Sequence, residues 1–139
     1  MSGKILTIFG GSGFIAFELV YKLSDHFKEI RVLSRNIEKC KQIKVIKNVD
    51  LFLYDPSNTS SFTRHLKDSH IVINTVGILN ESRKITFDDV HFNFVKSLVS
   101  KSRENNVAKF IHLSALNADM NGPSTVSYTH LTLPTILLV

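Results

Sequence analysis

Short apolar runs alternate with amphipathic stretches along most of this 139-residue chain. The first run, residues 5–9, is β-branched and aromatic and ends at two glycines, which predicts a strand buried on both faces. Similar runs predict four further strands, at residues 30–33, 49–54, 71–76 and 110–113. The pattern therefore predicts five strands separated by other elements.

Helical spacing of apolar residues fills the intervals between these strands. Ala16, Leu19, Val20 and Leu23 predict a helix after the first strand, and residues 37–41 predict a short polar helix or turn. Further helices are indicated by Phe62, His65 and Leu66, and by residues 86–102 with the stripe His91, Phe94, Val95 and Leu98. Because parallel strands need crossover connections, this alternation predicts an α/β protein with a parallel sheet covered on both faces.

Composition narrows the class of protein. With 43% apolar and 21% charged residues, the chain can build one compact core. The net charge of +5 comes from scattered lysines without interleaved aromatic residues, so we expect no nucleic-acid partner. A single cysteine, Cys40, excludes an internal disulfide, and no set of metal ligands can be assembled. No apolar run reaches about 20 residues, so we expect no transmembrane segment and at most peripheral membrane association.

A motif of small residues lies between the first strand and the first helix. Its residues are Gly10, Gly11, Ser12, Gly13, Phe14, Ile15 and Ala16. Gly10 permits a tight turn, Gly13 lets backbone N–H groups approach a pyrophosphate, and Ala16 lets the helix pack closely on the sheet. A plain glycine-rich turn is the alternative. The strand-to-helix position favours dinucleotide binding in a Rossmann-type doubly wound sheet.

The end of the second strand bears on the choice of cofactor. An NAD-specific site usually has an acidic residue there, whereas this chain has Ser34 and Arg35. Both can bind a 2′-phosphate, and the charge-assisted contact contributes roughly 1.5–3 kcal/mol. NADP(H) is therefore favoured over NAD(H). Alternatively, Arg35 lies on the surface or stacks on adenine.

The chain resembles the extended and atypical branch of the short-chain dehydrogenase/reductase superfamily over residues 4–125. Its GGSGFIA motif is close to that branch's GGxGFxG, with Ala16 in place of the third glycine. The segments VINTVGIL, TFDDVH and KFIHLSALNAD narrow the likeness to the nucleotide-binding accessory subunits of respiratory complex I, of the alpha-subcomplex subunit 9 type, and their bacterial relatives. This family resemblance implies that the predicted sheet is the N-terminal part of a larger domain.

This resemblance implies roles for particular residues. Asp55 would reach the adenine amino group, and the adenine and ribose side would be lined by Asn74, Thr75, Val76 and Gly77. Ser114 would occupy the catalytic serine position of the superfamily, although it could also simply close the fifth strand. We expect His91 and His112 to be structural rather than catalytic.

The resemblance also implies a function. The main hypothesis is an NAD(P)(H)-binding accessory subunit of NADH:quinone oxidoreductase, with complex I subunits as partners, in the bacterial cytoplasm or on the mitochondrial matrix side. One alternative is an NAD(P)-dependent reductase, epimerase or dehydratase, and another is a redox-sensing binder. Reductases of this superfamily use a tyrosine with a lysine four residues later. Here the residue four positions after Tyr128 is Thr132 instead of a lysine, so the chain as written is predicted to be inactive.

The sequence changes character from Val126 onward. Residues 126–135, VSYTHLTLPT, resemble the translation of a transposon adapter used to prepare sequencing libraries. We therefore expect an incomplete NAD(P)-binding domain at residues 1–125 and a non-native tail at residues 126–139. The alternative is a genuine terminal strand within residues 131–139.

Overall fold

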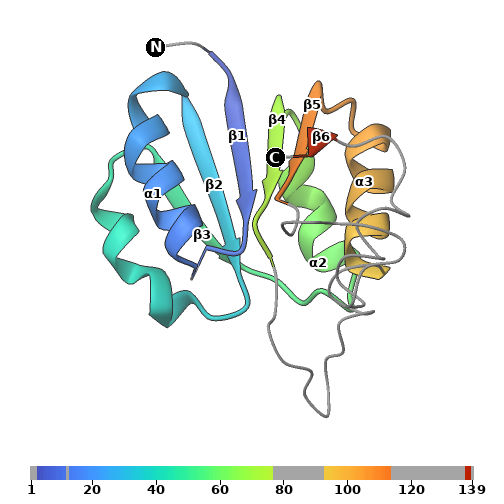
Figure 1. Ribbon diagram of the computed structural model, residues 1–139, viewed down its shortest axis with the longest axis horizontal. Helices are drawn as coiled ribbons and strands as arrows, with labels where there is room; N and C mark the ends of the chain where they lie inside the picture. The colour runs from blue at the N-terminus through green and yellow to red at the C-terminus, as the bar shows by residue number, and fades with distance from the viewer. Residues whose placement is uncertain (1–2, 12, 77–92, 114–136, 139) are drawn as a thin grey trace.

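A computed structural model describes residues 3–11, 13–76, 93–113 and 137–138 of this chain (Figure 1). Its strands form one sheet in the order β3-β2-β1-β4-β5-β6, with every neighbouring pair parallel. The strands are β1 Ile5–Phe9, β2 Glu29–Ser34, β3 Val49–Leu53, β4 Ile71–Asn74, β5 Lys109–His112 and β6 Leu137–Leu138. The α-helices are α1 Phe14–Leu23, α2 Ser60–Thr63 and α3 Phe94–Glu104, and the 3-10 helices are η1 Ser24–His26, η2 Ile37–Val45 and η3 Arg64–Leu66.

Helices cover both faces of the sheet. In Figure 1, α1 and η2 lie on one side, and α2 and α3 lie on the other. The central strand β1 serves both cores, because Leu6 and Ile8 pack with α1 and η2 while Phe9 packs with α2 and α3. The predicted α/β class, with a Rossmann-type doubly wound sheet and a first strand buried on both faces, is confirmed.

The element boundaries differ from the predicted ones in a few places. Segment 60–66 is split between α2 and η3, yet all three residues of its predicted stripe are buried. Of the helix predicted over residues 86–102, the structure describes the part that forms α3, which begins at Phe94 and ends at Glu104. Phe94, Val95 and Leu98 are buried as expected, and His91 lies outside the described residues.

The last strand, β6, consists of two residues. Leu137 pairs with Ile111 and Leu138 with His112, in parallel. The division of the chain at residue 125 stays a prediction.

The strand order reverses beside β1, whose neighbours are β2 and β4. In open parallel sheets, ligands bind outside the carboxyl ends of the strands at such a reversal. The carboxyl end of β1 lies at the lower edge of the sheet in Figure 1, since the chain enters β1 from the top. A ligand site is therefore expected at this edge of the sheet. None of the helices in the described part of the chain combines the length and apolar character needed to cross a membrane.

Candidate functional site

A small open pocket lies at this edge of the sheet. Its volume is about 100 Å³, and it is lined by Gly10, Gly13, Ser34, Arg35, Tyr54, Thr75 and Val76. These residues come from the ends of four neighbouring strands, β1 to β4. Pockets that enclose whole small molecules typically measure roughly 300–1,000 Å³, so the pocket formed by the described residues is too small to enclose a whole dinucleotide.

The turn after β1 requires glycine at its first two positions. Gly10 has a φ of +95°, a left-handed conformation that strains residues with a Cβ. A Cβ on Gly11 would overlap the side chain of Val32. The N–H groups of both glycines donate to the carbonyl oxygen of Leu33, at 3.0 and 3.1 Å. These two glycines therefore allow the turn to pack against the end of β2.

Gly13 is different, because no described residue excludes a side chain there. A Cβ at this position would meet one atom within 4 Å, the carbonyl oxygen of Gly10 at 3.4 Å. Gly13 caps α1 without a side-chain hydrogen bond. The first N–H groups of a helix have no acceptor within the helix, so those of α1 can donate to an anion. The absence of a Cβ at Gly13 leaves room for that anion to approach.

At the end of β2, Ser34 and Arg35 behave differently. Ser34 is buried, and its hydroxyl donates to the carbonyl oxygen of Asn36 and accepts from the N–H of Asn36, both at 3.1 Å. It therefore fixes the turn after β2. Arg35 is exposed at the pocket and makes no ion pair with any described residue. Its guanidinium group is available to a ligand.

Tyr54 is a pocket residue that the sequence reasoning missed. Its ring is buried and makes edge or tilted contacts with three phenylalanines, with centroid distances of 5.3 Å to Phe9, 6.2 Å to Phe62 and 5.7 Å to Phe94. Burial raises the pKa of Tyr54, and the positive charge of Arg35 opposes that shift only in part. The phenol therefore stays neutral at physiological pH. The one sequence signal was an aromatic residue at the end of an apolar strand.

Asp55 follows Tyr54 but does not line the pocket. Its Oδ1 accepts hydrogen bonds from the Ser57 hydroxyl at 2.7 Å and the Ser57 N–H at 2.9 Å. These bonds lower the pKa of the Asp55 carboxyl, so it is ionised at neutral pH. Asp55 stays exposed at the carboxyl end of β3, and its contact with adenine stays a prediction.

The end of β4 contributes two pocket residues and one buried support. Thr75 and Val76 line the pocket, and the Thr75 hydroxyl donates to the carbonyl oxygen of Phe9 at 2.7 Å. Asn74 lies behind them, fully buried. Its Oδ1 accepts from the N–H of Val76 at 3.1 Å, and its Nδ2 lies 3.1 Å from Nδ1 of His112. Asn74 therefore joins β4 to β5 and holds the loop that reaches the pocket.

The remaining candidate residues divide into two groups. Phe14 and Ile15 begin α1, with their side chains exposed. The other candidates fall outside the described residues: Ser12, Gly77, Ser114, Tyr128 and Thr132. Within the described part of the chain, no three histidine, cysteine, aspartate or glutamate residues are placed to hold a metal ion.

Comparison with known proteins supports a nucleotide-binding interpretation of this edge. A family model described as NAD(P)H-binding matches residues 10–135. The mitochondrial NADH dehydrogenase [ubiquinone] 1 alpha subcomplex subunit 9 of Mus musculus is 28% identical over 89% of this chain. The protein of the same name from Dictyostelium discoideum is 30% identical over 91% of the chain. The chain spans 34% and 36% of their lengths, about a third.

Solved structures show the same fold. The X-ray structure of Pen from Bacillus thuringiensis superposes with a TM-score of 0.80 at 18% identity, covering 95% of this chain and 43% of that one. At this identity the likeness concerns the fold alone. It confirms the doubly wound arrangement that brings the four strand ends together.

Proposed function

Because this chain belongs to the NAD(P)H-binding family, we propose that it holds NADP(H) at the turn between β1 and α1, as part of an accessory subunit of NADH:quinone oxidoreductase. The nicotinamide would supply hydride chemistry in a catalytic protein, whereas here the nucleotide is held as a bound component. This proposed role depends on how the residues of this chain bind the phosphates and the ribose of the nucleotide.

One observation carries the proposal: among the described residues, a Cβ at position 13, in front of the first turn of α1, would contact only the carbonyl oxygen of Gly10, at 3.4 Å. Gly10 and Gly11 are explained by the packing of the turn, but the packing of the described residues does not require glycine at position 13. A pyrophosphate provides one, because it needs unobstructed N–H donors and the positive end of a helix. Thr75 and Val76 would border the same ligand, since they line the same pocket.

The preference for NADP(H) rests on Arg35. No acidic residue stands at the end of β2, where a carboxylate would bind the 2′-hydroxyl of NAD and repel a 2′-phosphate. The exposed guanidinium of Arg35 can pair with that phosphate instead. The hydroxyl of Ser34 is engaged with Asn36, so we assign Ser34 to positioning Arg35 rather than to binding the phosphate.

The accessory role is supported by the relatives named as NADH dehydrogenase subunits. Since the chain spans about a third of their length, assembly is a proposal about the whole protein. We place that protein in the bacterial cytoplasm or on the matrix side of the inner mitochondrial membrane. Copurification of the full-length protein with quinone reductase subunits would support this role. Carbonyl-dependent oxidation of NADPH would instead identify a reductase.

Isothermal titration calorimetry with NADPH and NADH tests the nucleotide site on the full-length protein. We expect tighter binding of NADPH, and we expect Arg35→Asp to weaken NADPH binding by at least roughly 10- to 100-fold while NADH binding persists. Lys67→Asp is the matched control, because Lys67 is exposed, lies outside the pocket and undergoes the same charge change.

The possible results separate the two parts of the proposal. Equal affinity for both nucleotides, before and after the Arg35 change, overturns the preference for NADP(H) alone. No binding of either nucleotide to a folded protein, with none carried through purification, overturns the site itself.

A further inference from the structure

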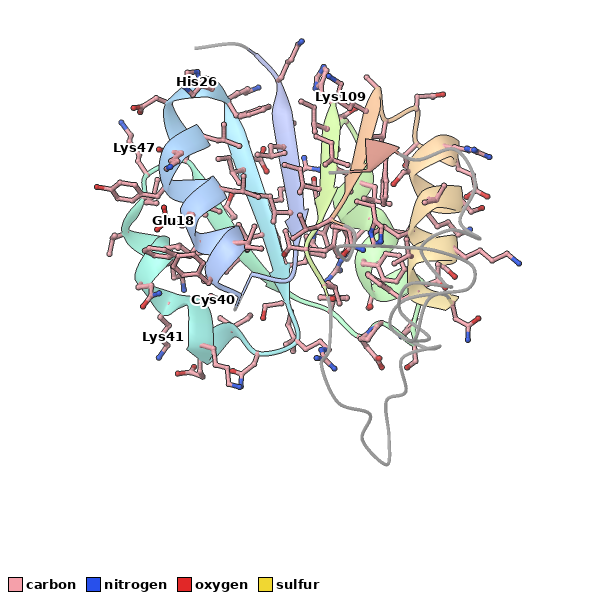
Figure 2. All side chains as sticks on the ribbon, in the orientation of Figure 1. Glu18, His26, Cys40, Lys41, Lys47 and Lys109 are labelled. Atoms are coloured by element: carbon pink, nitrogen blue, oxygen red, sulfur yellow. The ribbon has the colours of Figure 1, made fainter. Side chains whose placement is uncertain are left out.

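A cluster of lysines on and just after η2 has no part in the nucleotide pocket. Lys39, Lys41, Lys44 and Lys47 fall within nine consecutive positions, and all four are exposed. The other lysines of the chain lie elsewhere in the sequence, so this segment has the densest positive charge. Figure 2 shows Lys41 and Lys47 at opposite ends of the layer formed by α1 and η2, both on its outer side.

The burial pattern of η2 leaves these lysines on its outer side. The segment consists of 3-10 turns on either side of a kink at Cys40. In a 3-10 turn, residues three apart lie above one another. Cys40 and Ile43 are buried against the sheet and Ile46 is half-buried, so this row faces inward. The lysines lie outside this inward row and are exposed.

Most of this positive charge is not neutralised within the described part of the chain. Lys41 pairs with Glu38 at 2.7 Å. Lys39, Lys44 and Lys47 make no ion pair with a described residue. We call these three lysines, together with Val45 between them, the basic face.

Exposed apolar side chains accompany the basic face. Val45 is 86% exposed, and on the neighbouring helix α1 Tyr21 is 69% exposed. Among the described residues, every exposed large apolar side chain except that of Leu53 belongs to α1 or η2. The layer of α1 and η2 therefore carries both exposed apolar side chains and three lysines that have no ion-pair partner among the described residues.

We propose that the basic face is a docking surface for a membrane containing anionic lipids. Clustered lysines are attracted to anionic headgroups, and tyrosine is favoured at the depth of the headgroups. A protein partner fits less well, because the centres of protein interfaces are enriched in arginine and depleted of lysine, and this face contains lysines alone. The inference does not depend on nucleotide binding, since the pocket shares no residue with the basic face.

Sedimentation with lipid vesicles tests the charge requirement on the full-length protein. We expect binding to vesicles of phosphatidylcholine mixed with phosphatidylserine, little binding to phosphatidylcholine alone, and loss of binding in molar salt. K39Q/K44Q/K47Q should lower the partition coefficient roughly 100-fold. The control K67Q/K96Q/K109Q removes the same charge from exposed positions away from η2 and should bind nearly as well as the unmodified protein.

Three results of this experiment would overturn the proposal. They are equal loss in both triple variants, equal binding to neutral and anionic vesicles, and no binding to either. Thermal unfolding of both variants shows whether each remains folded.

A fluorescence experiment tests the contact itself. The chain contains no tryptophan, so Val45→Trp introduces a single reporter at the basic face. Its emission should shift to shorter wavelength with anionic vesicles, whereas Lys109→Trp, at the start of β5, should show no shift. An unshifted Val45→Trp protein that remains folded would overturn membrane docking and favour an acidic protein partner.

Discussion

Gly10 and Thr75 approach each other so closely that no side chain fits between them. The Thr75 hydroxyl donates to the carbonyl oxygen of Phe9, and a Cβ on Gly10 would lie 2.5 Å from that hydroxyl oxygen. The contact joins the ends of β1 and β4, the two strands that border the reversal of strand order. Gly10 is therefore required by the fold, whether or not a nucleotide is bound.

Gly10→Ala should destabilise the protein. The positive φ of Gly10 and the displacement of Thr75 together should lower the free energy of unfolding by about 1–3 kcal/mol, as measured by urea denaturation. Gly3→Ala is the control, since a Cβ there meets nothing within 4 Å, and it should change stability by less than about 0.5 kcal/mol. Equal stability of the two variants would contradict this account of the turn.

Gly13→Ala should separate binding from folding. Its backbone, with φ −84° and ψ 157°, suits alanine, and among the described residues the methyl group would contact only the carbonyl oxygen of Gly10, at 3.4 Å. The lower entropy of the unfolded chain and the weaker helix cap then act in opposite directions, so stability should change little. Nucleotide affinity should fall roughly 10- to 100-fold, because the methyl group blocks hydrogen bonds to the charged phosphates.

Calorimetry and urea denaturation of the same Gly13→Ala preparation measure both quantities. Unchanged affinity would show that phosphate does not approach α1 at this point. A large loss of stability would show instead that Gly13 is a structural glycine like Gly10.

The elements of this fold were predictable because each depends on local patterns. The apolar run at residues 5–9 gave the bounds of β1, and the spacing of Ala16 and Val20 gave the buried face of α1. The course of η2 was less predictable. Its inward-facing residues recur every three positions, and its backbone departs from helical angles at Cys40. Neither an α-helical nor a strand period therefore describes η2.

The pocket was predictable in position but not in the partners of its side chains. Its glycines and Arg35 follow from the order of strand, turn and helix. The burial of Asn74 depends on the pairing of β4 with β5, in which Asn74 stands opposite His112, and no local pattern sets that register. Tyr54 enters the pocket through contacts with phenylalanines from three different elements, which become neighbours only in the folded protein.

His65 should make the stability of the protein depend on pH. Burial, followed by the charges of Arg64 and Arg31, lowers the pKa of its ring. The unfolded chain therefore takes up a proton near the ordinary histidine pKa of about 6.5, before the folded protein does. The contribution of neutral His65 to the free energy of unfolding is fully present above a pH of about 6.5. This contribution decreases as the pH falls toward the pKa of His65 in the folded protein.

His65→Phe should reduce this pH dependence. A phenyl ring can keep the stacking on Phe52, whose ring centroid lies 4.1 Å from that of His65, but it takes up no proton. The difference in unfolding free energy between pH 7 and pH 5, measured in urea, should be smaller in the variant. The Asp55 carboxyl, whose pKa is lowered, affects stability only at lower pH. Its contribution to the free energy of unfolding is lost below a pH of about 3.9. An unchanged difference would show that His65 is not the group responsible.

Two buried serines should respond oppositely to alanine. Ser69 is 4% exposed, and its hydroxyl bonds to that of Thr7 at 2.5 Å, whereas Ser102 is 3% exposed and its hydroxyl has no hydrogen-bond partner among the described residues. Ser69→Ala leaves Thr7 with one bond fewer and should cost about 1–2 kcal/mol. Ser102→Ala should be neutral or stabilise by up to about 1 kcal/mol, because it removes an unsatisfied buried group and alanine favours helix.

Urea denaturation of the two serine variants under identical conditions gives this comparison directly. The sign of the difference matters more than its size, since both substitutions delete one buried hydroxyl and leave the same methyl group. If Ser102→Ala destabilises the protein as much as Ser69→Ala does, the Ser102 hydroxyl is satisfied in the folded protein. That result would contradict the assignment of Ser102 as an unsatisfied buried group.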